Sequence, residues 1–205
     1  MNRVLPNLFN TEMVRAILER RKGATRRSVK GYIPDDAVWG YTAFTPKGYI
    51  SCRGTFADGY GEKFFKLPCE PGNILYVRET WKKAPNGYYY YEDWQKNVIA
   101  DITKWKPSIH MPKEAARIWL KVTDVKVERL QNITEDGSKA EGAIDNRGFI
   151  HFSDDEYDRI HTAREHFIEI WNSTIKKSDF ERYSWDTSPW VWVVEFERCE
   201  KPEGV

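Results

Sequence analysis

Residues 118–130 have the sequence IWLKVTDVKVERL, and the spacing of their apolar side chains decides the predicted fold class. Apolar residues occupy alternate positions from Ile118 to Val122, and the alternation resumes in the opposite phase at Val125. A period of two is typical of a β-strand that buries one face. Asp124 marks the change of phase, so the segment predicts either two strands or one bent strand.

The flanking segments predict further strands and helices. Strands are expected at residues 74–77, 88–91 and 190–196, short hairpins and loops at 31–70, and helices at 10–22, 134–142 and 153–174. Gly23 is a natural stop for the first helix, and the basic segment 24–30 is expected to be an exposed turn. A capping box at Ser153–Glu156 opens the last helix. Strands mixed with helices predict the α+β class.

The composition limits the function classes. The 205 residues carry a formal net charge of +1, and aromatic residues make up 15% of the chain. The length fits a single domain, 1–205, and the aromatic content excludes an intrinsically disordered chain. The balanced charge argues against a protein that holds long nucleic acids by neutralising phosphates. Stacking on aromatic rings would still allow a base to bind.

Several other classes of site lack their sequence signals. No segment is apolar enough for a transmembrane helix or resembles a signal peptide, so we expect a cytoplasmic protein with no membrane partner. Cys52, Cys69 and Cys199 form no Cys-x-x-Cys pair, which predicts free thiols. The histidines form no metal-ligand pair, and phosphate-binding glycine loops are absent. Neither a metal nor an organic cofactor is expected.

The segment Arg21–Arg27 has two interpretations. It can be a solvated basic helix end, stabilised by the negative end of the helix dipole. Alternatively, Lys22 and Thr25, three residues apart, approach each other across the helix terminus. Burial lowers the pKa of a lysine, and a neutral lysine could activate the Thr25 hydroxyl as a nucleophile. A carboxylate would then be needed to orient Lys22, and spacing alone does not identify it.

Four motifs in order resemble those of the ASCH-domain family. Ile17–Arg27 resembles the opening motif of the family, an apolar helix followed by a lysine and then Thr-x-Arg. Pro71–Val77 is similar to its Gly-Asp-x-Leu-x-Val strand, although Asn replaces the Asp here. Val122–Gly142 resembles the later block that ends in Ala-Glu-Gly. The stretches 77–81 and 107–112 are similar to those of a longer, phage- or prophage-associated branch.

This resemblance implies a fold and a function. The implied fold is PUA-like, a small mixed β-barrel flanked by helices, here with insertions at about 31–70, 82–116 and 143–188. Members are taken to engage RNA or nucleosides, so a modified nucleoside or base, and RNA, are the implied partners. One bacterial branch removes the acyl group from N4-acylated cytosine compounds, such as N4-acetylcytidine. Its Lys/Thr/Glu triad falls on Lys22, Thr25 and Glu141, with Gly137 as a departure in the helix before Glu141.

Five more residues are candidates for substrate binding. Arg27 is a candidate donor to the oxyanion of an acyl-transfer intermediate. Trp81, close to Glu79, is the first candidate for stacking on a pyrimidine, with a core position as the alternative. Ser108 and His110 are candidates for contacts with the base or the ribose.

Other functions remain open at this point. A non-catalytic RNA-binding module would bind structured RNA and hydrolyse nothing, and the near-zero net charge counts against it. A ribonuclease would need a general acid and base on either side of a phosphate, which the Lys/Thr/Glu set suits less well. A phage accessory protein that binds a host protein is a further alternative.

Overall fold

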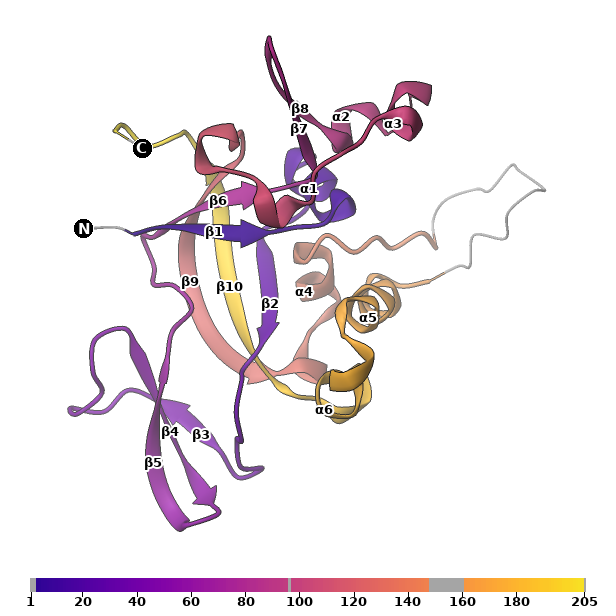
Figure 1. Cartoon of the computed structure of the whole chain (residues 1–205). Helices are drawn as coiled ribbons and strands as arrows, with labels where there is room; N and C mark the ends of the chain where they lie inside the picture. Colours follow the sequence, from indigo (N-terminus) through magenta and orange to yellow (C-terminus); the bar gives the residue numbers. More distant parts are fainter. Residues whose placement is uncertain (1–2, 96, 148–160, 205) are drawn as a thin grey trace.

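The computed structural model describes residues 3–95, 97–147 and 161–204, which form a mixed α+β fold (Figure 1). A five-stranded sheet dominates it, in the order β1-β6-β9-β10-β2. The bounds of these strands are β1 (Val4–Leu8), β6 (Ile74–Arg78), β9 (Trp119–Arg129), β10 (Trp190–Cys199) and β2 (Ala24–Ser28). β1 pairs with β6 in parallel, and the other neighbours are antiparallel. The strands predicted at 74–77 and 190–196 are therefore confirmed.

The segment that decided the fold class is one bent strand. In the pairing of β9 with β10, Asp124 lies opposite Glu195 and Val122 lies opposite Phe196, so Thr123 is an extra residue in β9. Such a bulge reverses the side-chain phase and bends the strand. Val122 and Val125 are consequently both buried in the same core.

The main sheet is open, so the expectation of a closed barrel is wrong. β1 and β2 are its two edge strands and are not hydrogen-bonded to each other. A side chain bridges them instead: Nη2 of Arg27 donates to the carbonyl oxygen of Leu8 at 3.0 Å. Figure 1 shows how strongly β9 and β10 curve, although the curvature stops short of closure.

The two faces of β10 enter different cores, as the alternation in its sequence predicts. Trp192 and Val194 pack into a core with α1 and the central strands. Val191 and Val193 pack into a second core with Phe167 and other residues that follow β9. The sheet is therefore covered on both faces near β2.

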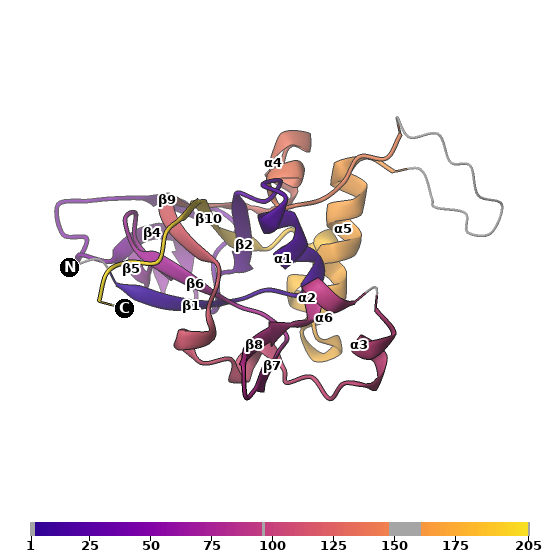
Figure 2. The same ribbon diagram turned by 90° about the horizontal axis from the view of Figure 1, so that it is seen from above.

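Of the described helices, α1, α4 and α5 lie beside β2, as Figure 2 shows. The helix bounds are α1 (Thr11–Leu18), α2 (Tyr91–Trp94), α3 (Val98–Ile102), α4 (Glu135–Ala140), α5 (Ala163–Thr174) and α6 (Phe180–Tyr183). α5 ends at Thr174 as predicted, and a capping box of Thr162 and Glu165 opens it. The capping box predicted at Ser153–Glu156 lies outside the described residues.

Two expectations near the first helix are wrong. α1 ends at Leu18 rather than at Lys22, because Arg20 adopts a left-handed backbone conformation with φ of 61°. The segment 24–30 is largely strand β2, and not an exposed turn. The basic charge of this segment suggested an exposed turn. Arg26 is instead buried, because it pairs with the carboxylates of Glu128 and Glu141.

The segments expected to be insertions carry their own elements. Residues 31–70 contain a three-stranded sheet of β3 (Val38–Gly40), β4 (Tyr49–Phe56) and β5 (Gly59–Lys66). Residues 81–102 contain the hairpin of β7 (Trp81–Ala84) and β8 (Gly87–Tyr90), followed by α2 and α3. In the described part of the chain, no helix is long and apolar enough to span a membrane.

Candidate active site

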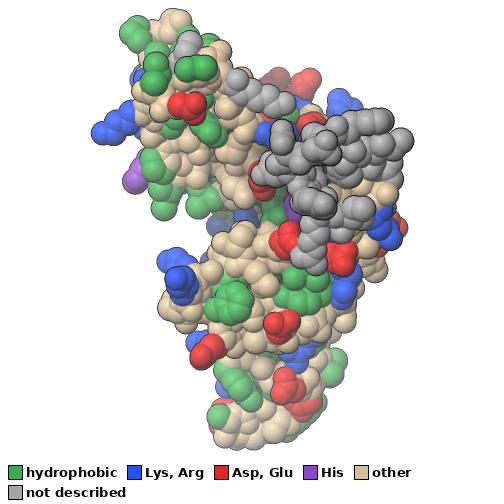
Figure 3. Space-filling model, turned by 90° about the vertical axis from the view of Figure 1, so that its right-hand side faces the viewer, with side chains coloured by type: hydrophobic (Ala, Val, Ile, Leu, Met, Phe, Trp, Pro, Cys, Tyr) green, Lys and Arg blue, Asp and Glu red, His purple; other side chains and the backbone are tan. Residues whose placement is uncertain are grey.

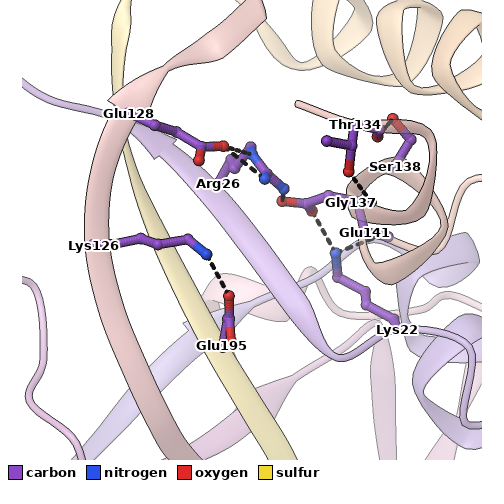
Figure 4. Close-up of polar contacts among 9 residues, drawn as sticks. All are labelled: Lys22, Arg26, Lys126, Glu128, Thr134, Gly137, Ser138, Glu141 and Glu195. Atoms are coloured by element: carbon purple, nitrogen blue, oxygen red, sulfur yellow. Dashed lines mark hydrogen bonds and ion pairs between the residues drawn. The ribbon is translucent and has the colours of Figure 1, made fainter. Parts of the chain in front are cut away.

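Lys22 lies in the turn between α1 and β2, with its side chain fully buried. Its Nζ donates to Oε2 of Glu141 at 2.8 Å and to the main-chain oxygen of Glu141 at 2.7 Å. The ammonium also lies 5.5 Å from the centre of the Phe9 ring. Figure 4 shows Lys22 and Glu141 pointing toward each other from different elements. The structure thus joins two candidate residues that are 119 positions apart.

The position of Glu141 follows from how α4 begins and ends. Oγ1 of Thr134 caps the helix by accepting from the amide of Gly137 at 3.0 Å, as predicted. Gly142 ends it with φ of +96°, and a Cβ there would lie 2.8 Å from Cβ of Ala16. A glycine is therefore required both by the backbone conformation and by the close approach to α1. That approach sets Glu141 beside Lys22.

Glu141 has a second cationic partner. Nη1 of Arg26 donates to its Oε1 at 3.2 Å, while Nε and Nη2 of Arg26 donate to Oε1 of Glu128 at 3.0 and 2.7 Å. A Cβ at Gly137 would lie 3.1 Å from Cγ1 of Ile133 and 3.4 Å from Nη2 of Arg26. The glycine that weakens α4 as a helix therefore lies in a closely packed part of the site, with Ile133 as the nearest neighbour. Figure 4 shows the resulting chain of charges, from Glu128 through Arg26 and Glu141 to Lys22.

Burial lowers the pKa of Lys22 from its ordinary value, because the charged form is poorly solvated in the interior. The carboxylate of Glu141 opposes this shift, and the charges of Arg27 and Arg26 add to it. A lysine whose pKa is lowered can accept a proton closer to neutral pH. The environment of Lys22 therefore suits a general base.

Thr25 faces away from Arg26, because successive residues of β2 point to opposite sides of the sheet. It lines a cavity of about 120 Å³ together with Glu141. The full lining is Leu8, Phe9, Asn10, Met13, Thr25, Arg26, Arg27, Glu141, Phe167, Ile170, Trp171 and Thr174. Among the described residues, the Thr25 hydroxyl has no hydrogen-bond partner, so it makes no hydrogen bond to Lys22. Lys22 is not part of this lining, and it contacts the lining residue Glu141.

Arg27 also belongs to this cavity. One of its nitrogens, Nη2, donates to the carbonyl oxygen of Leu8, and the guanidinium lies 5.8 Å from the centre of the Phe9 ring. Within the described residues, its Nε and Nη1 have no protein acceptor. They remain available as donors to a ligand in the cavity.

One wall of the cavity comes from a segment that the small amidohydrolases are expected to lack. Phe167, Ile170 and Trp171 of α5 contribute to the lining, and Nε1 of Trp171 is fixed by the carbonyl oxygen of Tyr183 at 2.8 Å. Figure 3 shows this side of the molecule, where the surface is hollowed between the part that carries α2 and α3 and the part that carries α5 and α6.

The other candidate substrate-binding residues lie outside this lining. Glu79 is buried and forms a two-pronged ion pair with Arg117, at 2.9 Å for each contact. Trp81 packs in a separate small core with Met111. Ser108 and His110 belong to a single 3₁₀ turn, residues 108–110, in which the His110 side chain is exposed. The structure therefore joins Lys22 to Glu141 and places Glu141, Thr25 and Arg27 in one cavity lining, whereas these four residues lie elsewhere.

Sequence reasoning missed four residues of the site. Arg26 and Glu128 were missed because their charges suggested solvent-exposed positions. The alternation of residues 24–27 could have indicated a strand with Arg26 on the face opposite Thr25. No sequence signal places Phe9 or Trp171 at the cavity, because residues far apart in the chain form its lining.

The described residues contain no group of three His, Cys, Asp or Glu side chains arranged to hold a metal ion. The chain matches no family model, no curated protein and no solved structure. Membership of the ASCH-domain family thus stays a prediction from the sequence motifs. Support for a function comes from the geometry of Lys22, Thr25 and Glu141.

Proposed function

We propose that the protein is an amidohydrolase that removes the acyl group from N4-acylated cytosine compounds such as N4-acetylcytidine. The proposal includes membership of the ASCH-domain family, with a PUA-like sheet that is open. The observation that carries it is the buried Lys22–Glu141 pair, at 2.8 Å, beside a cavity that Thr25 lines. These are the three residue types that the resemblance requires, contributed by three separate parts of the fold.

The chemistry is acyl transfer to water. Lys22 in its neutral form takes the hydroxyl proton of Thr25, and the Thr25 oxygen attacks the acyl carbonyl carbon. The bond from that carbon to N4 of cytosine breaks, and the leaving amine takes up the proton. Water then hydrolyses the ester on Thr25, which releases the carboxylate and restores the hydroxyl. Arg27 donates to the oxyanion that forms both during the attack by Thr25 and during hydrolysis of the ester.

The same site supports a direct attack by water. Lys22 and Thr25 share no hydrogen bond in the structure, so Glu141 and Lys22 could instead activate a water molecule that Thr25 positions. Both routes give the same products, and both need the lysine in its neutral form. They differ in whether Thr25 forms a covalent ester.

The cavity favours a small substrate. Its volume of about 120 Å³ lies below the ~300 Å³ at which pockets begin to enclose whole drug-sized ligands. We infer that the acyl group and the amino edge of the pyrimidine enter, while a ribose stays outside. The rings of Phe9 and Trp171 offer apolar surfaces to the base.

The test is release of cytidine from N4-acetylcytidine, followed by absorbance with and without EDTA. We expect turnover that survives the chelator and is lost in Lys22→Met and Glu141→Gln. Thr25→Val removes the hydroxyl at nearly constant volume, and full activity in this variant would exclude Thr25 as the nucleophile. Folding of each variant is checked by circular dichroism.

If the wild-type protein releases no base or nucleoside from any N4-acylcytosine compound, the amidohydrolase is wrong. Submicromolar, salt-sensitive binding of structured RNA in the same preparation would then favour the binding module.

A further inference from the structure

Glu141 divides its two carboxylate oxygens between two cations. Oε2 accepts from Lys22 at 2.8 Å and Oε1 accepts from Arg26 at 3.2 Å. All three side chains are almost fully buried, so water solvates none of them appreciably. The charge state of Lys22 therefore depends strongly on the other two residues.

We propose that Arg26 is a positioning residue that allows Lys22 to work in its neutral form, and that Glu128 orients Arg26 and limits this effect. The catalytic role that this inference gives to Lys22 rests on the proposed function. The predicted effect on the titration of Lys22 rests only on the contacts within the charge cluster. Arg26 and Glu128 both lie outside the Lys22, Thr25 and Glu141 set.

Arg26 matters most once Lys22 has lost its proton. With only Lys22 as its partner, Glu141 would become a buried carboxylate without a cation each time Lys22 lost its proton. Such an uncompensated buried charge is costly, so Lys22 would keep its proton. A guanidinium keeps its charge in proteins, and that of Arg26 is bound to Oε1 of Glu141. Glu141 thus keeps one cation when Lys22 becomes neutral.

Glu128 acts on Arg26 in the opposite direction. It accepts from two nitrogens of Arg26, at 2.7 and 3.0 Å, and so orients the guanidinium and neutralises part of its charge. Its side chain is 21% exposed, against 6% for Arg26, so a substitution there disturbs the interior less. Loss of the Glu128 charge leaves more of the Arg26 charge to act on Glu141 and Lys22.

Other charged groups bear on this cluster from the neighbouring elements. Arg27, next to Arg26 on β2, lowers the pKa of Lys22 through its charge, and Glu141 at the end of α4 raises it. A second pair, Lys126 of β9 and Glu195 of β10 at 2.7 Å, lines another cavity together with Arg26 and Glu128. Neither residue forms an ion pair with Glu141, so the pair supplies a control (Figure 4).

The experiment measures the titration of Lys22 directly. Full-length protein is labelled with ¹³C at Cε of lysine, and the Lys22 signal is assigned by its absence in Lys22→Met. The midpoint is then compared among wild type, Arg26→Gln, Glu128→Gln and Glu195→Gln. The pH dependence of cytidine release is recorded on the same proteins.

The proposal predicts opposite shifts for the two variants. Arg26→Gln moves the Lys22 titration, and the rise of activity with pH, to higher pH. At a pH well below the midpoint, a rise of one pH unit in the midpoint lowers the rate by about tenfold, because the neutral fraction of Lys22 falls in that proportion. Glu128→Gln moves both to lower pH, and Glu195→Gln moves neither. A merely structural role would not produce shifts of opposite sign.

Shifts of the same sign in the two variants would overturn the proposal. If Arg26→Gln fails to fold, the absence of a shift in Glu128→Gln would overturn it alone. If the predicted order of titrations is found but the wild type releases no cytidine, the charge cluster works as inferred and the proposed reaction is wrong.

Discussion

Replacement of Glu141 by Gln should cost far more stability than the same replacement at Glu195. Both carboxylates bind a lysine at almost the same distance, 2.8 Å for Lys22–Glu141 and 2.7 Å for Lys126–Glu195. Their burial differs: the side chains are 0% and 5% exposed in the first pair and 49% and 41% exposed in the second. The comparison therefore holds the carboxylate–lysine distance nearly constant while burial differs, and Glu141 has Arg26 as an additional partner.

The magnitudes follow from this difference. Removing one partner of a buried pair costs about 3–5 kcal/mol, because the other charge is left uncompensated in the interior. An exposed pair contributes about 0–1 kcal/mol, since water solvates and screens both ions. For a chain of 205 residues, Glu141→Gln should lower the melting temperature by roughly 6–20 °C, and Glu195→Gln by at most about 4 °C.

The assay is equilibrium unfolding in urea at pH 7, with melting followed by circular dichroism. The two variants are compared with wild type in the same buffer at two salt concentrations. The small cost of Glu195→Gln should shrink further at high salt, whereas that of Glu141→Gln should persist. Equal costs for the two substitutions would refute the view that Lys22 and Glu141 are a desolvated pair.

Three further predictions concern pH and packing. Folding lowers the pKa of Lys22 from its ordinary value of 10.5. Between the lowered pKa and 10.5 the unfolded state therefore binds more protons than the folded state, and stability should rise with pH over this range. Lys22→Met should lose this component of the pH dependence, measured by urea unfolding at several pH values from 7 upward. Burial raises the pKa of Glu79, and Arg117→Gln would remove its cation, so the stability deficit of that variant should shrink as the pH falls from 7 toward 5. Trp171→Ala should cost about 3–5 kcal/mol and raise the KM for N4-acetylcytidine more than it lowers kcat, because it removes one wall of the cavity; unchanged KM would show that α5 does not contact substrate.

The strands could be predicted well where one face is apolar. The phase change near Asp124 in the sequence is the bulge at Thr123 in the structure, and the alternation of Trp192 with Val193 separates the two cores. These features depend on local periodicity, which the sequence displays directly. The cap of α4 by Thr134 was predictable for the same reason, since capping is local.

The errors arose where tertiary contacts outweigh local preference. The end of α1 at Leu18 depends on Arg20, whose left-handed conformation carries no sequence signal. β2 has the composition of a turn, yet Arg26 is buried because Glu128 and Glu141 bind it. The sheet stays open at β1 and β2, and no pattern within either strand indicates whether two edges will meet.

The candidate site depended on the family resemblance more than on spacing. Lys22 and Thr25 suggested a base and a nucleophile, but Glu141 is 119 residues from Lys22 and only the motif order indicated it. The structure joins that pair and leaves Thr25 without a bond to the lysine. The wall from α5 and the partner Arg26 became visible only with the fold.

Cytidine release from N4-acetylcytidine by the wild type and by Lys22→Met, measured side by side, tests whether Lys22 is the base of the reaction. Lys22 is the proposed base in either route, whether Thr25 or water attacks. The account predicts steady turnover by the wild type, no turnover by Lys22→Met, and wild-type rates in the control Glu195→Gln. Turnover by a folded Lys22→Met variant at the wild-type rate would contradict it.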